Sequence, residues 1–133
     1  MKYVLDTDIC IYIIKKHPDR LIQKIAKTKL EYLAISSITV AEMEYGVQKS
    51  MYPEKNKLAL TKFLVPFCIL EFDESDAAEY GRIRANIESI GKPIGPYDLL
   101  IAAQAKSKGL TVVTNNDKEF RRIKGLKVEN WTK

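Results

Sequence analysis

The sequence predicts an α/β protein in which a mostly parallel sheet of four or five strands is covered by helices on both faces. Short apolar runs alternate with longer segments in which apolar residues recur at helical spacing. The apolar runs lack the polar alternation of a half-exposed strand, which is typical of strands in a parallel sheet. The 133 residues contain no repeat and no flexible linker, so we expect one domain, residues 1–133.

The first three elements are a strand and two helices. Residues 2–5 (KYVL) form a short apolar run and predict a buried strand. Residues 8–16 predict a helix, which must end before Pro18 because proline disfavours helical geometry in the residue before it. Residues 19–28 predict a second, amphipathic helix, because apolar and charged side chains alternate there at helical spacing.

The middle of the chain repeats this alternation. The apolar stretch YLAIS at 32–36 predicts the second strand. A serine precedes the helix expected at 37–50 and is a favoured N-cap. The helix expected at 53–64 begins with a proline, which is well tolerated in a first turn. The run FCILEF at 67–72 predicts the third strand.

The last part of the chain contributes helices with clear start and stop signals. Asp73 or Ser75 is expected to cap a long helix, and Gly91 to close it. The expected elements are a helix at 76–90, a helix from Pro96 to Gly109, a strand at 110–114, a short helix at 117–122 and an edge strand at 126–131.

Composition narrows the class of function. The net charge of +5 favours an anionic partner such as nucleic acid. Cys10 and Cys68 both lie in apolar contexts and predict buried free thiols in a reducing, cytoplasmic setting. His17, the only histidine, lies in a polar stretch, which argues against serine–histidine or cysteine–histidine catalysis. No apolar run is long enough to span a membrane, and no secretory signal opens the chain.

Ligand sites in parallel sheets lie beyond the carboxyl ends of the strands, which draws attention to the stretch LDTD. Asp6 directly follows the first strand, and Asp8 falls in the first turn of the next helix. Either acid is compatible with a capping role at that helix. We expect Asp8 to serve the helix terminus, where a carboxylate interacts well with the dipole, and Asp6 to serve the site.

Two further candidate acids lie on predicted helices. Glu42 shares a predicted helical face with Ile38 and Tyr45, so it lies on or beside an apolar stripe and needs a partner, either a basic side chain or a metal ion. Asp98 lies in the first turn of its helix, two residues after Pro96. An ordinary first-turn acid is the alternative interpretation of Asp98.

A fourth acidic position follows the last buried strand, where TNNDKEF contains Asn116, Asp117 and Glu119. Turn formation or capping accounts for one of these residues but not for all. Hard cations such as Mg²⁺ require several oxygen ligands from separate elements. Three or four carboxylates at one sheet edge of a basic protein therefore predict metal-assisted phosphodiester chemistry.

Three stretches, in this order, resemble a known family: YVLDTDICIYII at 3–14, ISSITVAEMEYG at 35–46, and IGKPIGPYDLLIAAQAKSKGLTVVTNNDKEFRRIKGLKVENW at 90–131. The chain resembles the PIN-domain ribonucleases, specifically the VapC-type toxins of bacterial toxin–antitoxin pairs. The resemblance covers essentially the whole chain. It implies a three-layer α/β/α PIN-like fold and a metal-dependent endoribonuclease.

The resemblance also implies a site. It maps the family's acids onto Asp6, Glu42 and Asp98, with Glu119 as the fourth and Asp117 as a substitute for it. Asp6 and Asp98 would hold Mg²⁺ or Mn²⁺, and the two glutamates would complete the pocket or bind a second ion.

Neighbouring side chains are expected to support that site. Other branches of the family carry an acid at the position of Asn116. Thr7 and Thr114 resemble hydroxyl residues that hold a carboxylate or a metal-bound water. Tyr97 is expected to pack in the core or against a helix, with base stacking as the alternative. Basic candidates for RNA contacts are Lys15, Lys16, Lys49, Lys92, Arg121 and Arg122.

The family's partners follow from the same resemblance. It implies an RNA substrate, frequently a tRNA, whose cleavage inhibits translation. It also implies a small antitoxin whose C-terminal segment occupies the acidic groove, together with a homodimer or a hetero-oligomer with the antitoxin.

A haloacid-dehalogenase-like phosphatase is the main alternative, with Asp6 as nucleophile and Asp8 as acid–base. That family has a hydroxyl residue where this chain has Cys10, and a late pair of acids where this chain has asparagines. A response-regulator receiver with a phospho-acceptor at Asp73, and a binding module whose acids only cap helices, are weaker alternatives.

Overall fold

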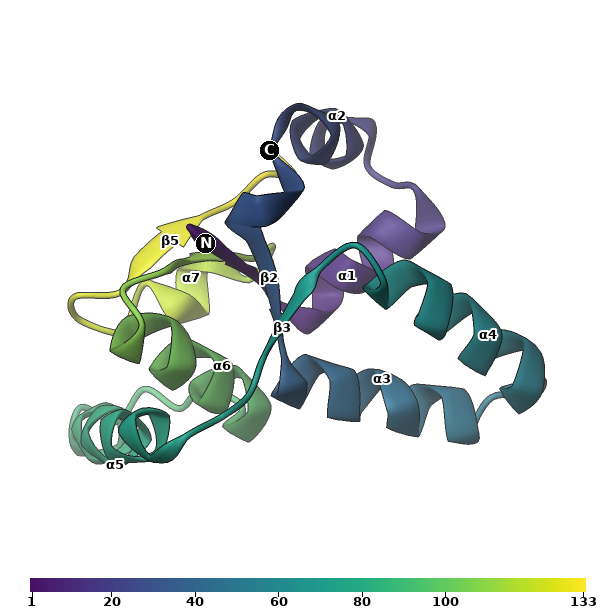
Figure 1. Ribbon diagram of the computed structural model, residues 1–133. Helices are drawn as coiled ribbons and strands as arrows, with labels where there is room; N and C mark the ends of the chain where they lie inside the picture. The colour runs from purple at the N-terminus through teal and green to yellow at the C-terminus, as the bar shows by residue number, and fades with distance from the viewer.

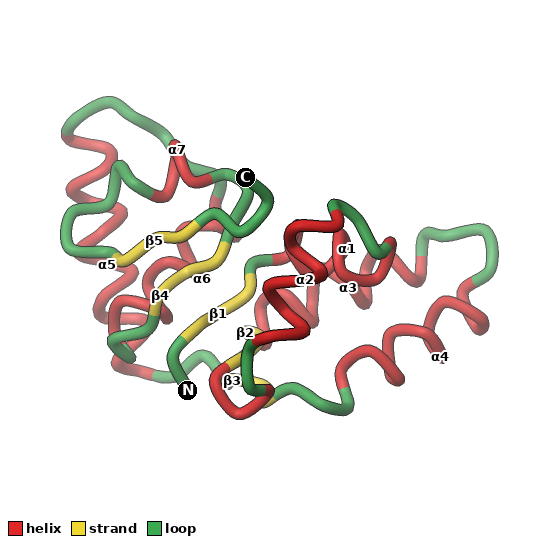
Figure 2. The backbone as a smooth tube through the Cα atoms, turned by 90° about the horizontal axis from the view of Figure 1, so that it is seen from above, coloured by secondary structure: helices red, strands yellow, loops and turns green.

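The computed structural model describes residues 1–133 and contains one five-stranded sheet in which all strands are parallel. The strand order is β3-β2-β1-β4-β5, so the first strand lies at the centre of the sheet (Figure 2). The strands are β1 (Tyr3–Leu5), β2 (Leu33–Ser36), β3 (Cys68–Leu70), β4 (Thr111–Val113) and β5 (Lys127–Glu129). The expected α/β fold is confirmed, and the sheet is parallel throughout.

Seven α-helices cover the two faces of this sheet (Figure 1). The first four lie on one side, where α3 and α4 form a hairpin that extends beyond the sheet, and the last three lie on the other. The helices are α1 (Thr7–Lys15), α2 (Asp19–Lys27), α3 (Ser37–Gln48), α4 (Pro53–Leu64), α5 (Glu74–Ser89), α6 (Pro96–Ser107) and α7 (Asp117–Phe120). A short 3₁₀-helix at Leu30–Tyr32, which the pattern did not predict, leads into β2.

Successive residues of the strands enter two separate cores. Val4 belongs to the cluster on the α5–α6 side, whereas Leu5 belongs to the cluster on the α1–α4 side. In β4, Val112 and Val113 divide in the same way. All four side chains are fully buried. Because the sheet is buried on both faces, its strands appear in the sequence as uninterrupted apolar runs.

Capping residues fix the ends of the helices that carry the site. Asp73 caps α5 in a reciprocal capping box with Asp76. Gly91 and Gly109 adopt φ angles of +67° and +68° just after α5 and α6, a conformation that favours glycine. Pro96 occupies the first turn of α6, as expected. The observed boundaries differ from the expected ones by at most two residues, which is ordinary for helix and strand ends.

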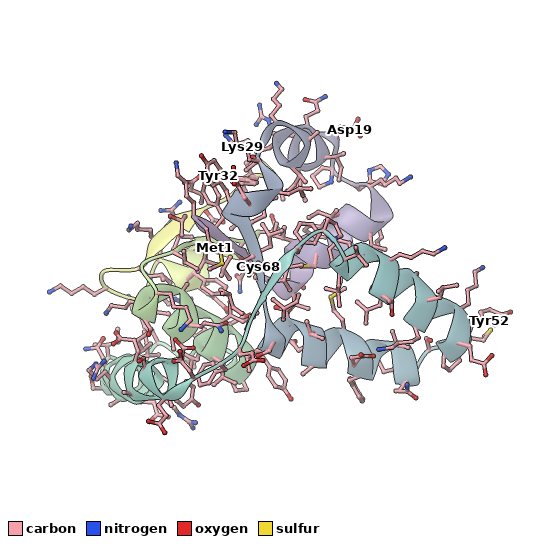
Figure 3. All side chains as sticks on the ribbon, viewed as in Figure 1. Met1, Asp19, Lys29, Tyr32, Tyr52 and Cys68 are labelled. Atoms are coloured by element: carbon pink, nitrogen blue, oxygen red, sulfur yellow. The ribbon has the colours of Figure 1, made fainter.

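The two cysteines do not share the same environment. Cys10 is fully buried, as predicted, but Cys68 is exposed, so the prediction of a buried thiol is wrong there. Cys68 opens the edge strand β3, which has a neighbouring strand on one side only (Figure 3). Cys68 is therefore exposed although its neighbours in the sequence are apolar, because it lies at the edge of the sheet and not in the interior. None of the helices is long and apolar enough to cross a membrane.

Candidate active site

Asp6 joins the central strand to the first helix. Its backbone N–H donates to the carbonyl of Val113 at 3.1 Å, which ties it to the carboxyl end of β4. Its carboxylate accepts a hydrogen bond from the N–H of Ile9 at 3.0 Å and so caps α1. Asp8 lies in the first turn of α1, as expected, but the expectation that Asp6 would serve the site and not the helix terminus is wrong. Asp6 is the cap, because it is the last extended residue before the helix.

Asp6 is buried, with 2% of the residue's surface exposed. Burial raises its pKa from 3.8 to about 7, against the lowering effect of hydrogen bonds from Thr114 and Ile9. Repulsion from Asp8 and Asp98 adds to the increase. Asp6 therefore lies close to other carboxylates in a poorly solvated position.

The pKa of Asp98 is raised in the same way, by burial and by a larger number of neighbouring carboxylates. Burial is the largest cause that raises its pKa to about 6, followed by the charges of Asp8, Glu119 and Glu42. A hydrogen bond from Asn116 acts in the opposite direction. The first turn of α6 thus faces acids from α1, α3 and α7. Asp8, exposed in the first turn of α1, belongs to this group although sequence reasoning had assigned it elsewhere.

Glu42 is held by a hydroxyl from the neighbouring helix. Thr7 Oγ1 donates to Glu42 Oε1 at 2.7 Å and lies 3.1 Å from the hydroxyl of Thr39. The predicted buried face of α3 through Ile38 and Tyr45 is wrong, since Tyr45 is 66% exposed.

The buried stripe of α3 is offset by one residue from the predicted face. It runs through Thr39, Met43 and Val47, at spacings of four residues. Glu42 lies at the edge of this stripe and faces α1, where it meets Thr7.

The candidates for the fourth acid separate into two groups around α7. The side-chain amide of Asn116 donates to Glu119 and also contacts Asp98. Asp117 instead accepts from Asn130 at 2.9 Å and lies near Arg121 and Lys133, which together lower its pKa. The structure therefore brings Glu119 and Asn116 to the acidic cluster and directs Asp117 toward the C-terminal residues.

Thr114 supports the same edge of the sheet. It is fully buried at the end of β4, and its hydroxyl accepts the backbone N–H of Asn116 at 2.8 Å. The same side chain hydrogen-bonds Asp6 and lowers the pKa of that carboxyl. Thr114 thus couples the central acid to the turn that carries Asn116.

Five carboxylates make up the acidic cluster: Asp6, Asp8, Glu42, Asp98 and Glu119. None of them lies within 4 Å of a basic nitrogen, whereas acids elsewhere in the chain form ion pairs. No three Asp, Glu, His or Cys side chains already form a set of metal ligands. An oxygen-only cluster without a basic partner suits a hard cation held by one or two carboxylates and water.

A hollow of about 490 Å³ opens beside these acids between α1 and α3. Thr7, Asp8 and Glu42 line it together with Tyr45, Lys49 and Tyr97. Tyr97 is 56% exposed, so the expected core position of this side chain is wrong. A second hollow of about 410 Å³, with a largely apolar lining from α1, α3 and α4, shares Thr7 and Glu42 with the first.

The sequence model of the family described as PIN domain matches residues 3–126. The chain belongs to the PIN-domain family. Curated relatives of this PIN domain include a Haemophilus influenzae protein named Ribonuclease VapC2, 44% identical over 131 residues and 98% of each chain. Another is the Shigella flexneri tRNA(fMet)-specific endonuclease VapC, 39% identical over 132 residues and 99% of each chain. The resemblance to VapC-type members is confirmed, and PIN-domain ribonucleases generally depend on a divalent metal ion.

Solved structures similar to this PIN domain include VapBC complexes. One is the DNA-bound VapBC complex from Salmonella typhimurium, with a TM-score of 0.93, 41% identity and 98% of each chain covered. Another is VapBC2 from Rickettsia felis bound to a promoter DNA fragment, with a TM-score of 0.88 and 44% identity over 98% of this chain and 99% of that one. The three-layer α/β/α PIN fold is confirmed.

Proposed function

We propose that this PIN domain is a metal-dependent endoribonuclease that acts as the toxin of a toxin–antitoxin pair. The observation that carries the proposal is the group of carboxylates at the carboxyl edge of the sheet without a basic partner. Acids that repel one another and lack a countercharge are costly unless a cation binds them. The relatives named ribonuclease and endonuclease support the same conclusion.

In this proposal Asp6 and Asp98 hold the divalent cation, Mg²⁺ or Mn²⁺, and Glu42 and Glu119 complete the pocket. When bound, such a cation lowers the pKa of a water and offsets the charge of the scissile phosphate. Thr7 holds the carboxylate of Glu42 toward the cleft by its 2.7 Å hydrogen bond.

Thr114 and Asn116 restrict the acids around the cation in the same way. Thr114 fixes the carboxyl group of Asp6, and Asn116 fixes those of Glu119 and Asp98. These hydrogen bonds limit the movement of the ligands before the substrate arrives.

The proposed substrate is a tRNA, since the similar proteins of Shigella flexneri and Salmonella typhimurium are named tRNA(fMet)-specific endonucleases. Lys49 and the exposed ring of Tyr97 line the hollow beside the acids, where they suit a phosphate and a base respectively. The proposed place of action is the cytoplasm, where both tRNA and reducing conditions for the two free thiols are found.

The proposed partner is a VapB-like antitoxin, in line with the toxin–antitoxin complexes among the similar structures. The apolar hollow between α1, α3 and α4 suits an amphipathic segment of such a partner, because it leads directly to Glu42. A homodimer, or a hetero-oligomer with the antitoxin, is the proposed assembly.

RNA cleavage by the purified chain tests the proposal. We expect a tRNA transcript to be cut in Mg²⁺ or Mn²⁺ and not in EDTA. Asp6→Asn and Asp98→Asn should retain the fold by circular dichroism and lose cleavage by about 100-fold or more. Glu31→Gln is the control, since Glu31 is exposed in the turn that enters β2 at the opposite edge of the sheet. Cleavage by the Asp6 and Asp98 variants at the parent's rate would refute the proposal.

The phosphatase alternative is less compatible with the geometry. Its nucleophile would be Asp6, a residue that is 2% exposed and already accepts the N–H of Ile9. Nucleophilic attack requires the phosphorus atom of the substrate to contact the carboxylate directly, which the burial of Asp6 opposes more strongly than the binding of a small cation. Beryllium fluoride trapping at Asp6 would reverse this conclusion.

A further inference from the structure

A third hollow in the PIN domain is lined mainly by basic and polar side chains. It has a volume of about 510 Å³ and lies between α2 and the residues that follow β5. Figures 1 and 2 both show the C-terminus close to α2. We call this hollow the basic groove. Its lining residues include Arg20, Gln23, Lys24, Lys27, Arg121, Glu129 and Lys133.

Three cations of the basic groove share one face of α2. Arg20, Lys24 and Lys27 are spaced by four and three residues, which places them on the same side of a helix. Leu21 lies on an adjacent side of α2, where it is fully buried and anchors the helix. None of the three basic groups has a carboxylate within 4 Å, so their charges are uncompensated.

The other charged residues of the basic groove leave a large positive excess. The basic nitrogens of Arg121 and Lys133 lie 3.8 and 4.0 Å from the carboxylate of Asp117, which is the only ion-pair partner of either side chain. The carboxylate of Glu129 accepts the indole N–H of Trp131 at 2.8 Å. Five basic side chains against this single lining acid leave an excess of four charges, in a chain whose net charge is +5. With Asp117 counted as well, the excess is three positive charges, so the basic groove remains positive.

The one-turn helix α7 connects the basic groove with the acidic cluster. Glu119 contacts Asn116 on the side of the acids, whereas Arg121 lines the groove. The C-terminal residues are tied to the same edge of the sheet, because Thr132 donates to Asn115 at 2.8 Å. A helix with side chains is about 10–12 Å across, which corresponds to roughly three nucleotides at ~3.4 Å per nucleotide.

We propose that the basic groove binds the phosphodiester backbone of structured RNA, outside the few nucleotides that occupy the acidic cleft. The inference rests on the proposed ribonuclease function and adds a second contact region to it. Arg20 to Lys27 spans seven residues of helix, about 10 Å, so its three cations match several consecutive phosphates of one strand. The groove selects RNA by shape and charge rather than by sequence.

The lining favours a nucleic acid over an acidic protein segment. Its two apolar residues, Val128 and Trp131, are 9% and 5% exposed. A peptide partner would need accessible apolar anchors, which this surface does not present. Phosphates need only cations and hydrogen-bond donors.

The test uses a variant in which two lysines of the basic groove are replaced by glutamate. It measures the affinity of this variant for a long RNA and its cleavage of a short one. We expect Lys24→Glu/Lys27→Glu to bind a tRNA transcript about tenfold or more weakly than the parent at moderate salt. Fluorescence anisotropy measures this affinity in EDTA, so that no cleavage occurs. The slope of log affinity against log salt should become shallower by about two. With Mg²⁺ present, kcat/KM for a short oligonucleotide that spans the cut site should stay at the parent's value.

Lys55→Glu/Lys62→Glu is the matched control. These two lysines are exposed on α4 and have no ion-pair partner, so the variant has the same change in net charge at a distant place. It should bind tRNA as the parent does. Equal weakening by both double variants, or unchanged tRNA affinity in the groove variant, would overturn the inference.

Two further outcomes separate this inference from its alternatives. If the groove variant loses binding to polyglutamate but not to tRNA, the groove is a site for an acidic protein, and the inference is wrong. The parent could instead bind tRNA through the groove and yet cut neither the tRNA nor the short oligonucleotide with Mg²⁺ or Mn²⁺. In that case the proposed ribonuclease function is wrong, while the groove remains a binding site.

Discussion

Asp6 performs two tasks that sequence reasoning had divided between two acids. It caps α1 through the N–H of Ile9, and it lies among the carboxylates at the sheet edge. A capping acid must stay at the helix terminus, so its position in the cleft is fixed by local backbone geometry. Burial at this position limits the solvation of its charge, which is why metal-free folding is expected to depend on pH.

The first prediction concerns that pH dependence. Burial raises the pKa of Asp6 from 3.8 to about 7, so between these values the folded chain binds more protons than the unfolded chain. Protonated Asp6 therefore makes its full stabilising contribution to the free energy of unfolding below pH ~4. This stabilisation is lost as the pH rises to ~7. In EDTA at pH 8, Asp6→Asn should unfold with a free energy about 1–2 kcal/mol higher than the parent.

Urea denaturation at pH 4 and pH 8 measures this difference. At pH 4 the two proteins should be almost equally stable, because both carry a neutral side chain that can cap α1. Saturating Mn²⁺ at pH 8 should stabilise the parent and reduce the difference, since only the parent offers the carboxylate. A variant less stable than the parent at pH 8 in EDTA would contradict this account of Asp6.

The second prediction identifies the fourth acid. Glu119→Gln removes a charge that faces Asp98, so RNA cleavage should decrease about 10- to 100-fold. Asp117→Asn removes a charge that faces Lys133 and Arg121, so cleavage should stay within about twofold of the parent. Single-turnover kinetics with excess enzyme compares the two variants directly. Greater loss of cleavage in the Asp117 variant would reverse the assignment.

Among the elements, α6 carries Asp98 and is the most deeply packed helix of the site. Ala102 and Ala105 are fully buried one and two turns after Asp98, and α5 lies along α6. Their small side chains allow the sheet and α5 to approach α6 closely. The position of Asp98 is therefore set by packing beneath it rather than by contacts in the cleft alone.

The third prediction tests that dependence. Ala102→Leu adds three carbon atoms to a filled core, so the free energy of unfolding should decrease by about 1–3 kcal/mol. Cleavage should also decrease, since α6 must shift to admit the new side chain. Ala85→Leu, on the exposed side of α5, should change stability by no more than about 0.5 kcal/mol and leave cleavage intact. Urea denaturation and an RNA cleavage assay give the two readouts.

At this scale the sequence predicts the elements well, because apolar periodicity, proline and glycine signals reflect local backbone rules. It predicts their surroundings less well. Cys68 and Tyr45 both lie in apolar contexts and are nevertheless exposed, because β3 is an edge strand and α3 extends beyond the sheet. Strand order and helix extension depend on tertiary arrangement, which local pattern does not encode.

For the whole molecule, one sheet separates two cores. Trp131, the only tryptophan, belongs to the α1–α4 core, whereas Phe120 and Ile101 belong to the α5–α6 core. Neighbouring residues of β1 and β4 enter both cores, so neither can be disrupted without the shared strands. We therefore propose that residues 1–133 form a single folding unit.

The fourth prediction follows from that arrangement. Urea unfolding followed by tryptophan fluorescence and by far-ultraviolet circular dichroism should give the same midpoint and slope. Fluorescence reports the core around Trp131, while circular dichroism reports the helices on both faces. Midpoints that differ beyond experimental error would show that the two cores unfold separately.

The acidic cluster was predictable in part at this scale because parallel strands bring their carboxyl ends to one edge. That rule and the family resemblance both select Asp6, Glu42 and Asp98. The place of Asp8 was missed, because only the three-dimensional path shows that the first turn of α1 faces that of α6. Arg121 was among the predicted basic contacts, but the basic groove that it lines was missed, since α2 and the C-terminal residues are about a hundred residues apart in the sequence.

The central position of β1 has a consequence for the timing of protein synthesis. β1 is made first, yet one of its two neighbours, β4, begins only at Thr111. Asp6 therefore cannot meet Asp98 or Glu119 in the native arrangement until nearly the whole chain has left the ribosome. A nascent chain of this protein therefore carries all the residues of β1 and α1 well before the acidic cluster can assemble.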